Sequence, residues 1–463
     1  MKVNLIYPCS PDSADKHDFS PIAKSLDLLL RPARDLLGLG KTNYTPPLSL
    51  LMLGAVTPPD VEVQIIDERL SEIDFHEEVD LVGITVTTRA APRAYEISTE
   101  YRKRGVTVVV GGVHPSVLPE ESSRYVDVVV VGEGEEAWPK VLADYKQGSL
   151  KRIYRGKRQN NLDELPYPRR ELIRHPEDYL TLKVLAASRG CPNSCTFCAA
   201  GFAIGKQYRT RKVESVVAEL SEVSGSYVAF TDDNLGWDIA YAKKLFRAIV
   251  PLNIKWIGSV TLPAVEDDEL LELIAKSGCV SLCLGFESLS PRVITDIKKQ
   301  RTNNPARYRE LIKRVHDYGI PIIGTFIVGF DGDDKNTFGT LTDFINETCI
   351  EEPTVHVLIP YPGTRIYRQF EREGRLLCKD WKYYDTARGY VVYQPKQMTP
   401  EELVDGYLTV LQKVFSLRPA IERLVGARTL SSATIGSLFY NLAWRRSAAL
   451  QKAQLQKTTE NVS

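Results

Sequence analysis

The chain has 463 residues, of which 43% are hydrophobic and 25% charged, so we expect a soluble protein of two or three domains. Lysine plus arginine balances aspartate plus glutamate at 59 each, which excludes a global field that would attract nucleic acid or an anionic membrane. The start, MKVNLIYPCSP, lacks the features of a signal peptide, and no apolar run approaches the roughly 20 residues that span a bilayer. We therefore expect a cytoplasmic protein.

The first segment, residues 1–148, alternates apolar runs with helical stretches. The runs are residues 3–7, 61–66, 81–85, 106–110 and 126–131. Nearly continuous Val, Ile and Leu indicate strands that are covered on both faces, so we predict a parallel α/β sheet of the Rossmann or flavodoxin-like kind. Ligands of such sheets bind beyond the carboxyl ends of the strands.

A polar segment with ProTyrPro at 166–168 predicts a linker over residues 149–178. A second series of strand-like runs follows, at residues 184–188, 227–231, 254–260, 280–285, 320–328 and 355–359. Six β units with intervening helices predict a (β/α)6 partial TIM barrel over residues 179–375.

The strand series stops after Gly363, and we predict a small C-terminal helical domain over residues 376–450. MetThrProGluGlu at 398–402 has the form of a helix start, with Thr399 as the N-cap and Pro400 at the first position. The polar tail, residues 451–463, is expected to be disordered.

Eight cysteines in a chain of this size favour metal binding over a disulfide scaffold, because a large core in a reducing compartment needs no cross-links. Five are scattered and are expected to be small buried apolar side chains: Cys9, Cys279, Cys283, Cys349 and Cys378. The other three, Cys191, Cys195 and Cys198, lie within eight residues of one another. This clustering marks them as candidate metal ligands.

The motif SerArgGlyCysProAsnSerCysThrPheCys at 188–198 places three cysteines at CxxxCxxC spacing, directly after the first strand of the predicted barrel. Three thiolates can cap three corners of a [4Fe-4S] cluster and leave one iron open to another ligand. The alternatives are a zinc knuckle, which normally needs a fourth ligand, or three buried cysteines. The end of a barrel strand is also where barrel active sites lie.

With this spacing and an aromatic residue, Phe197, before the last cysteine, the sequence resembles the radical S-adenosylmethionine superfamily. The resemblance implies that the open iron chelates S-adenosylmethionine and that one electron from the cluster cleaves it to a 5′-deoxyadenosyl radical. It also implies a flavodoxin or ferredoxin as the electron donor.

Further stretches match the superfamily in the expected order, although each taken alone could be a helix cap or a tight turn. The resemblance assigns to S-adenosylmethionine binding the residues that follow or lie in successive strands: Phe197, Asp232, Asp233, Asn234, Glu287 and Thr325. Asp232 to Asn234 would contact the amino group, Glu287 the ribose, and the segment 324–330 the adenine.

The N-terminal segment resembles the cobalamin-binding domain that precedes the radical domain in one branch of the superfamily. GlyGlyValHisProSer at 111–116 and ValValGlyGluGlyGlu at 130–135 carry this resemblance. It assigns cobalamin contacts to Thr85, Thr87, Gly111, Gly112, His114, Gly132 and Gly134.

One feature departs from many cobalamin proteins: an Asp followed two residues later by a His that ligates cobalt is absent, and AspGluArgLeuSerGlu occupies 67–72. His114 is the nearest candidate imidazole, but a purely structural role is the stronger interpretation. A flavodoxin-like module without a cofactor stays open as an alternative for the whole domain.

In this branch the resemblance implies methyl transfer to an unactivated carbon of a lipid, tetrapyrrole or natural product, most of them hydrophobic small molecules. Two alternatives stay open: cyclisation or ring rearrangement without methyl transfer, and a non-catalytic iron-sulfur protein. No nucleic-acid partner and no transmembrane segment are expected. The helical stretch from Val425 to Trp444 leaves peripheral membrane contact open, although an ordinary helix that docks on the rest of the protein is the stronger interpretation.

Overall fold

The computed structural model of the chain describes residues 1–9, 44–203, 205–222, 227–386, 388–427, 437, 441, 442 and 445. They divide into two compact units: the first holds Met1–Gly190 and Ala199–Ala229, and the second holds Cys191–Cys198 and Phe230–Ser463. The predicted disordered tail and most of the apolar stretch after Val425 lie outside the described residues. In the described part, no helix combines the length and apolarity needed to cross a bilayer.

The first unit contains a parallel sheet with the strand order β2-β1-β3-β4-β5-β6. Its strands are β1 (Lys2–Tyr7), β2 (Glu62–Asp67), β3 (Leu81–Thr85), β4 (Thr107–Gly111), β5 (Val128–Val131) and β6 (Ile153–Arg155). The five predicted strands are present within two residues of their expected bounds. Strand β6 was not predicted, and it lies in the segment interpreted as a linker.

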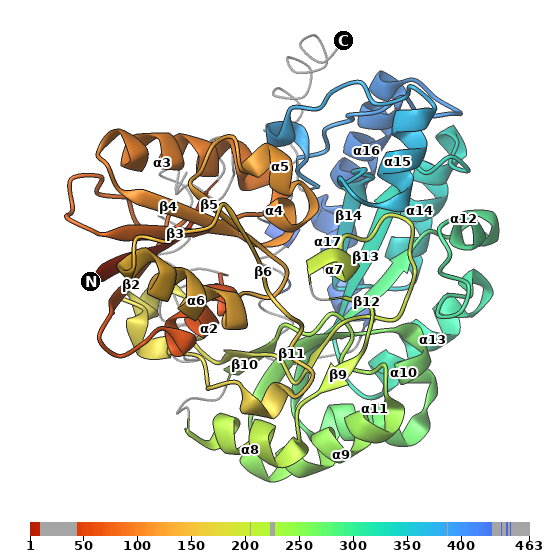
Figure 1. Cartoon of the computed structure of the whole chain (residues 1–463). Coiled ribbons are helices and arrows are strands. Elements are labelled where there is room, and N and C mark those ends of the chain that lie inside the picture. The colour runs from red at the N-terminus through yellow and green to blue at the C-terminus, as the bar shows by residue number, and fades with distance from the viewer. Residues whose placement is uncertain are drawn as a thin grey trace. The chain divides into compact units, whose positions relative to one another are not determined.

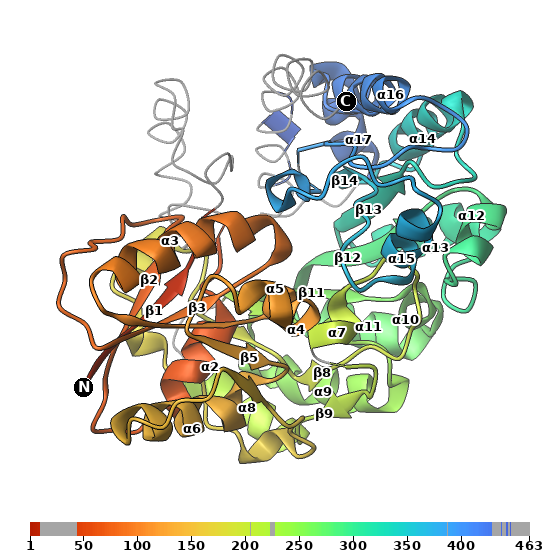
Figure 2. The same cartoon turned by 45° about the horizontal axis from the view of Figure 1, so that its top comes forward.

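Helices cover both faces of this sheet (Figure 1, Figure 2). Helix α3 (Ala91–Lys103) lies on one face, and α2 (Leu48–Val56) and α6 (Gly134–Lys146) lie on the other. The core on the α2 and α6 side includes Leu5 and Trp138, and the Trp138 indole N–H donates to Thr57 Oγ1 at 2.8 Å. A Cβ at Gly83 would lie 2.8 Å from Leu5 and 3.1 Å from Trp138, so glycine allows this close packing.

The second sheet has six strands in the order β14-β13-β12-β11-β10-β7, and the boundary between the two units runs through β10. The strands are β7 (Val184–Leu185), β10 (Tyr227–Phe230), β11 (Lys255–Val260), β12 (Cys279–Glu287), β13 (Ile322–Val328) and β14 (Glu352–Val357). The predicted series of six strands and the α/β class are confirmed. The first run is shorter than expected, because residues 188–189 form a separate strand, β8 (Ser188–Arg189), that pairs antiparallel with β9 (Arg209–Thr210).

In the second unit, one face of strands β11 to β14 packs on helices (Figure 1). These helices are α9 (Ile239–Ile249), α11 (Asp268–Lys276), α13 (Tyr308–Asp317) and α14 (Lys335–Glu347). Phe286 and Phe326 stack at 5.3 Å between their centroids and meet Tyr308 of α13 and Phe344 of α14 edge-on. Side chains alternate between the two faces along each strand, and the opposite face carries more polar side chains. They include Ser259, Cys283, Thr325, Thr354 and His356.

The chain then forms α15 (Arg365–Arg372), α16 (Pro400–Val414) and α17 (Leu417–Gly426). Thr399 caps α16 through a capping box with Glu402, as predicted. Arg423 of α17 is fully buried, and its guanidinium donates to the carbonyl oxygens of Ile350 and Val414. These bonds join α17 to α16 and to the segment before β14, all within the second unit. The predicted domain boundaries stay a prediction.

Candidate active site

The three clustered cysteines lie in one loop, between β8 and the short helix α7 (Ala200–Ala203). None forms a disulfide; Cys191 and Cys195 are partly buried, and Cys198 is exposed. The pKa of the Cys195 thiol is raised to about 11, mainly by burial and to a smaller extent by negative charge on Cys198 and Cys191, so the three sulfurs are close enough to interact. Three neighbouring thiols without a fourth cysteine or a histidine in the loop are the donor set that a cluster with one open iron requires.

The loop is held by its backbone at Thr196. The Thr196 N–H donates to the carbonyl of Ile297 at 3.0 Å, and the Thr196 carbonyl accepts from the Ile366 N–H at 3.1 Å. Ile297 is the C-cap of α12 (Pro291–Asp296), and Ile366 lies in the first turn of α15. Next to this peptide, the Phe197 ring meets Phe330 edge-on at 5.9 Å. Two helix ends therefore fix the peptide between the last two cysteines, which sequence patterns did not reveal.

Asp232, Asp233 and Asn234 follow β10 as predicted, but their environments differ. Asn234 is buried, and its Oδ1 accepts from the Thr261 N–H at 3.2 Å, while no partner of its Nδ2 exists among the described residues. Asp232 is also buried. Asp233 is solvent-accessible, yet partial desolvation raises its pKa to about 6, and its charge acts on Cys191. Asp233 is thus a carboxylate whose charge acts on the cysteine loop, as the charge of Glu287 also does at Cys195.

Glu287, predicted to bind ribose, forms a buried ion pair with Lys299. The Lys299 ammonium also donates to the Gly285 carbonyl at 3.0 Å. Glu287 has a left-handed backbone with φ of 63°, and Asn303 Nδ2 donates to the carbonyls of Gly285 and Phe286 at 2.8 and 3.1 Å. Neither Lys299 nor Asn303 could be found by sequence patterns, because neither belongs to a motif.

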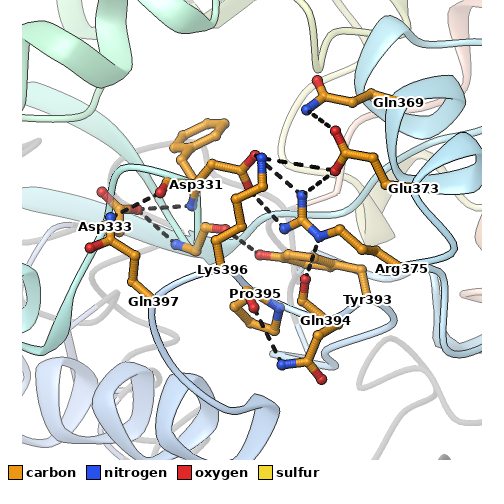
Figure 3. A network of polar contacts seen from close by, with 12 residues as sticks. Asp331, Asp333, Gln369, Glu373, Arg375, Tyr393, Gln394, Pro395, Lys396 and Gln397 are labelled. Carbon is orange, nitrogen blue, oxygen red and sulfur yellow. Dashed lines mark hydrogen bonds and ion pairs between the residues drawn. The ribbon is translucent and has the colours of Figure 1, made fainter.

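The loop after β13 is stabilised by the polar network of Figure 3. Asp333 Oδ2 accepts from the N–H groups of Gly329 and Phe330, both at 2.9 Å, and the Tyr393 hydroxyl donates to the Gly329 carbonyl. Burial raises the pKa of Asp333 to about 7, although the two N–H groups oppose this shift. Thr325, in β13 itself, contacts the Leu284 carbonyl only weakly, at 3.5 Å.

The same network joins residues far apart in sequence. Arg375 binds both carboxylate oxygens of Asp331, at 2.6 and 3.2 Å, and also contacts Glu373 at 2.8 Å. Lys396 adds a second cation 2.8 Å from Asp331. These contacts hold the segment after α15 against the loop that follows β13.

The candidate cobalamin residues lie at the carboxyl ends of β3, β4 and β5 in the first unit. Gly112 has φ of 105°, and a Cβ there would lie 2.9 Å from the backbone N and O of Val86. Gly132 has φ of 87°, and its N–H donates to Ser116 Oγ at 2.9 Å. Both glycines are therefore required by the protein backbone itself, and their cobalamin contacts stay a prediction. Thr85, Thr87, Gly111 and Gly134 are the other members of this edge.

His114 is fully buried in a polar cluster. Its Nε2 lies 3.2 Å from the Tyr95 hydroxyl and 3.3 Å from Glu121 Oε1, and the Tyr95 hydroxyl also contacts Ser122 Oγ at 3.1 Å. These hydrogen bonds join the His114 imidazole to neighbouring helices and so stabilise the loop after β4. The geometry thus favours the structural role over cobalt ligation.

An ion-pair cluster in the first unit connects the loop after β5 with the hairpin that precedes the cysteine loop. Arg209 of β9 pairs with Glu133, and both side chains are almost fully buried. Arg189 of β8 pairs with Glu135 at 2.6 Å. The loop that carries Gly132 and Gly134 is therefore attached to the strand that ends one residue before Gly190.

Two family models match the chain: the B12 binding domain over residues 42–142 and the radical SAM superfamily over residues 185–345. Bacteriochlorophyllide d C-12(1)-methyltransferase of Chlorobaculum tepidum is 30% identical over 82% of this chain and 85% of its own length. Bacteriochlorophyllide d C-8(2)-methyltransferase of the same organism is 30% identical over 73% and 79%, respectively. The solved structure of the methyltransferase TsrM from Kitasatospora setae shares the fold, with a TM-score of 0.60, 17% identity and full coverage of both chains.

The two matched models define a radical S-adenosylmethionine enzyme that carries a cobalamin-binding domain. Together with the relatives, they show that the chain belongs to the cobalamin-dependent radical S-adenosylmethionine methyltransferases. Its cofactors are a [4Fe-4S] cluster, S-adenosylmethionine and cobalamin. The zinc-binding, cofactor-free and non-catalytic alternatives are thereby excluded.

Proposed function

We propose that this methyltransferase acts on an unactivated carbon of a hydrophobic small molecule, and that a tetrapyrrole is the first class to test. The single observation that carries the proposal is the gathering of three thiols in one loop without a fourth ligand. The named tetrapyrrole methyltransferases, at 30% identity, support the choice of substrate class.

In this proposal Cys191, Cys195 and Cys198 hold the cluster, and the cluster, S-adenosylmethionine and methylcobalamin supply a hydrogen-abstracting radical and the methyl group. Asp233 attracts the amino group of S-adenosylmethionine, because its carboxylate lies near the cysteine loop. The buried Asn234 amide offers a donor to the same ligand. The loop after β13, held by Asp333, positions the adenine.

The Glu287 carboxylate would accept hydrogen bonds from the ribose hydroxyls while it stays paired with Lys299. Phe197, packed on Phe330, would shield the cluster from water on one side. Thr85, Thr87, Gly111, Gly112, Gly132 and Gly134 would line the cobalamin edge of the first unit, with His114 behind them as support.

The partners follow from the chemistry. A low-potential flavodoxin or ferredoxin would reduce the cluster, and the protein would work in the reducing cytoplasm, where thiols remain free to bind iron. A hydrophobic substrate could be collected at a membrane surface, and peripheral contact through the stretch that follows Val425 is part of the proposal.

The test is anaerobic reconstitution with iron, sulfide and hydroxocobalamin, followed by iron counting and a deoxyadenosine assay under reduction. We expect roughly four irons per chain and deoxyadenosine formation, and both should be lost in Cys195→Ser. Cys378→Ser, which changes a cysteine outside the loop, is the matched control and should retain both. A wild-type chain that binds no iron, or a Cys195→Ser variant that still makes deoxyadenosine, would refute the assignment.

Methyl transfer is tested separately by mass spectrometry, with S-adenosylmethionine labelled with deuterium in its methyl group and candidate tetrapyrroles. We expect the label in the product. Deoxyadenosine together with an unlabelled, cyclised or rearranged product would instead support the alternative reaction.

A further inference from the structure

His356 lies in β14, on the polar face of the second sheet. Along this strand, side chains on the apolar face, such as Val355 and Val357, are buried, whereas Thr354 and His356 on the polar face are partly accessible. Strand β13 follows the same alternation, with Thr325 among its accessible side chains. A ligand bound on the polar face can therefore reach the His356 ring.

The strand register places His356 beside the residues predicted to bind S-adenosylmethionine. Gly285 of β12, Thr325 of β13 and Thr354 of β14 form one row across the sheet. The Glu287 carboxylate lies over this row, because a Cβ at Gly285 would be 2.5 Å from Glu287 Oε1. His356 follows Thr354 by two residues, about 7 Å further towards the carboxyl end of the strand. Barrel active sites lie at this end of the strands.

The tautomer of His356 is fixed by a backbone contact. Its Nδ1 lies 3.1 Å from the Thr386 carbonyl oxygen, which can only accept, so Nδ1 carries the proton. Nε2 has no hydrogen-bond partner among the described residues and is not enclosed by them. Burial lowers the pKa of His356, against the Thr386 hydrogen bond and the charges of Glu287 and Asp385, which raise it. At neutral pH, Nε2 therefore presents an electron pair.

This is the arrangement of metal-binding histidines, in which one ring nitrogen binds the metal while the other N–H donates to a carbonyl and fixes the ring. Among the described residues, however, His356 belongs to no group of three metal-binding side chains. A metal held here must consequently bring most of its ligands with it. A metallated tetrapyrrole does so, because the pyrrole nitrogens hold the metal in the plane and leave an axial position open.

The segment that accepts the His356 N–H is rich in aromatic rings. Thr386 ends the stretch 381–386, which contains Trp381, Tyr383 and Tyr384. The Trp381 and Tyr384 rings meet edge-on at 4.9 Å, and Tyr384 is fully buried, so this stretch is well packed. Trp381 and Tyr383 remain partly accessible. Accessible aromatic rings offer the stacking contacts that a planar, largely apolar ligand uses.

We infer that His356 Nε2 is the axial ligand of the central metal of a tetrapyrrole substrate, and that the enzyme selects the metallated macrocycle over the metal-free form. The bond forms when Nε2 donates its electron pair to a divalent metal such as Mg²⁺, so no proton or electron is transferred. Because this contact is to the centre of the macrocycle, the carbons at its periphery stay free for methylation. The inference rests on the proposed tetrapyrrole substrate.

The experiment is equilibrium dialysis of the reconstituted full-length protein against magnesium protoporphyrin and, separately, against metal-free protoporphyrin. We expect the magnesium form to bind at least about tenfold more tightly, because only its metal can accept the Nε2 electron pair. The Soret band of the bound magnesium form should also move to longer wavelength, the direction that an axial nitrogen ligand produces.

Two variants of the histidine separate ligation from a structural role. His356→Asn keeps an N–H donor for the Thr386 carbonyl but has no atom in the place of Nε2. The preference for the magnesium form should disappear, while iron content and binding of the metal-free form stay near wild type. In His356→Gly, added imidazole should restore the preference, which a merely structural role of the side chain would not allow.

Cys283→Ala is the matched control, because Cys283 is a second side chain of the polar face that could bind a metal. This variant should keep the preference for the magnesium form. Loss of the preference in Cys283→Ala, or an unchanged preference in His356→Asn, would overturn the assignment to His356.

The wild-type protein alone already distinguishes the inference from the proposed function. Equal binding of both porphyrins would exclude the metal contact and leave the tetrapyrrole substrate intact. Binding of neither porphyrin would refute the tetrapyrrole class, and the inference with it.

Discussion

Two aspartates in one loop, Asp331 and Asp333, show how environment separates identical side chains. Asp333 is buried among backbone N–H groups, and its pKa rises to about 7 from the ordinary 3.8. Burial also acts to raise the pKa of Asp331, but hydrogen bonds from Arg375 and Lys396 outweigh it, and the pKa is lowered. The two groups therefore respond to pH in opposite directions.

The first prediction concerns Asp333→Asn, whose amide oxygen can accept the same two N–H groups. Because the folded pKa is raised, Asp333 stabilises the fold fully below about pH 4 and loses this contribution as the pH rises through about 7. We expect the variant to melt with wild type below about pH 4, to melt increasingly above wild type between about pH 4 and 7, and to stay several degrees higher above about pH 7, as measured by differential scanning fluorimetry.

Asp331→Asn is the control, and its effect on the melting temperature should have the opposite sign. Its lowered pKa means that the carboxylate stabilises the fold at neutral pH and that this contribution fades in acid. The variant should melt below wild type at pH 7, and the difference should shrink on acidification. If the melting temperatures of both variants changed with pH in the same way relative to wild type, the opposite pKa shifts assigned to Asp331 and Asp333 would be wrong.

At the scale of residues, the sequence predicted candidate site side chains only where they belong to a recognisable motif. The three cysteines and the residues after β10 both belong to the second unit. The contacts of the Thr196 peptide could not be predicted, because they join segments that are 101 and 170 residues apart in the chain. Lys299 could not be predicted because it belongs to no motif, although its partner Glu287 lies only 12 residues away. The roles of Gly112 and Gly132 in the backbone also required coordinates.

At the scale of elements, Gly190 joins β8 to the cysteine loop. It has φ of 92°, and a Cβ there would lie 2.2 Å from the Gln207 carbonyl oxygen. A side chain must therefore displace backbone and strain a left-handed residue, at a cost of roughly 1–3 kcal/mol. We expect Gly190→Ala to bind less than half of the wild-type iron after reconstitution, by colorimetric assay.

Gly201→Ala, in α7 on the other side of the cysteine loop, is the matched control. A Cβ there meets only Lys206 at an ordinary 3.7 Å, so iron loading should match wild type. Equal loading of both variants would show that the turn at Gly190 does not position the ligands.

Elements with strong apolar runs could be predicted from sequence, whereas short ones could not. Every predicted strand of the first sheet is present, because continuous Val and Ile favour buried parallel strands. Strand β6 has three residues in a polar segment, and β8 and β9 have two each, so pairing with neighbours rather than local pattern creates them.

At the scale of the whole molecule, the candidate ligands of the two metal cofactors belong to different units. All candidate cobalamin residues lie in the first unit, and all three cysteines lie in the second. We therefore expect independent loading: the triple variant Cys191→Ser/Cys195→Ser/Cys198→Ser should bind hydroxocobalamin like wild type, by its visible spectrum after gel filtration.

The reciprocal variant is Thr87→Tyr, which places a large ring at an exposed position two residues after the end of β3. Cobalamin binding should fall at least about tenfold, corresponding to 1.4 kcal/mol, while iron content stays near wild type. Loss of iron in this variant, or loss of cobalamin in the triple cysteine variant, would show that the two sites depend on each other.

The cysteine loop belongs to the second unit, although the chain on both sides of it belongs to the first. A ribosome releases these cysteines well before Ile297 and Ile366, whose backbone groups hold Thr196. The nascent loop therefore has no defined shape when it first emerges. We therefore expect iron delivery to be a late step of biogenesis, because a translation product that stops before α15 has the Ile297 carbonyl that holds Thr196 but lacks the Ile366 N–H.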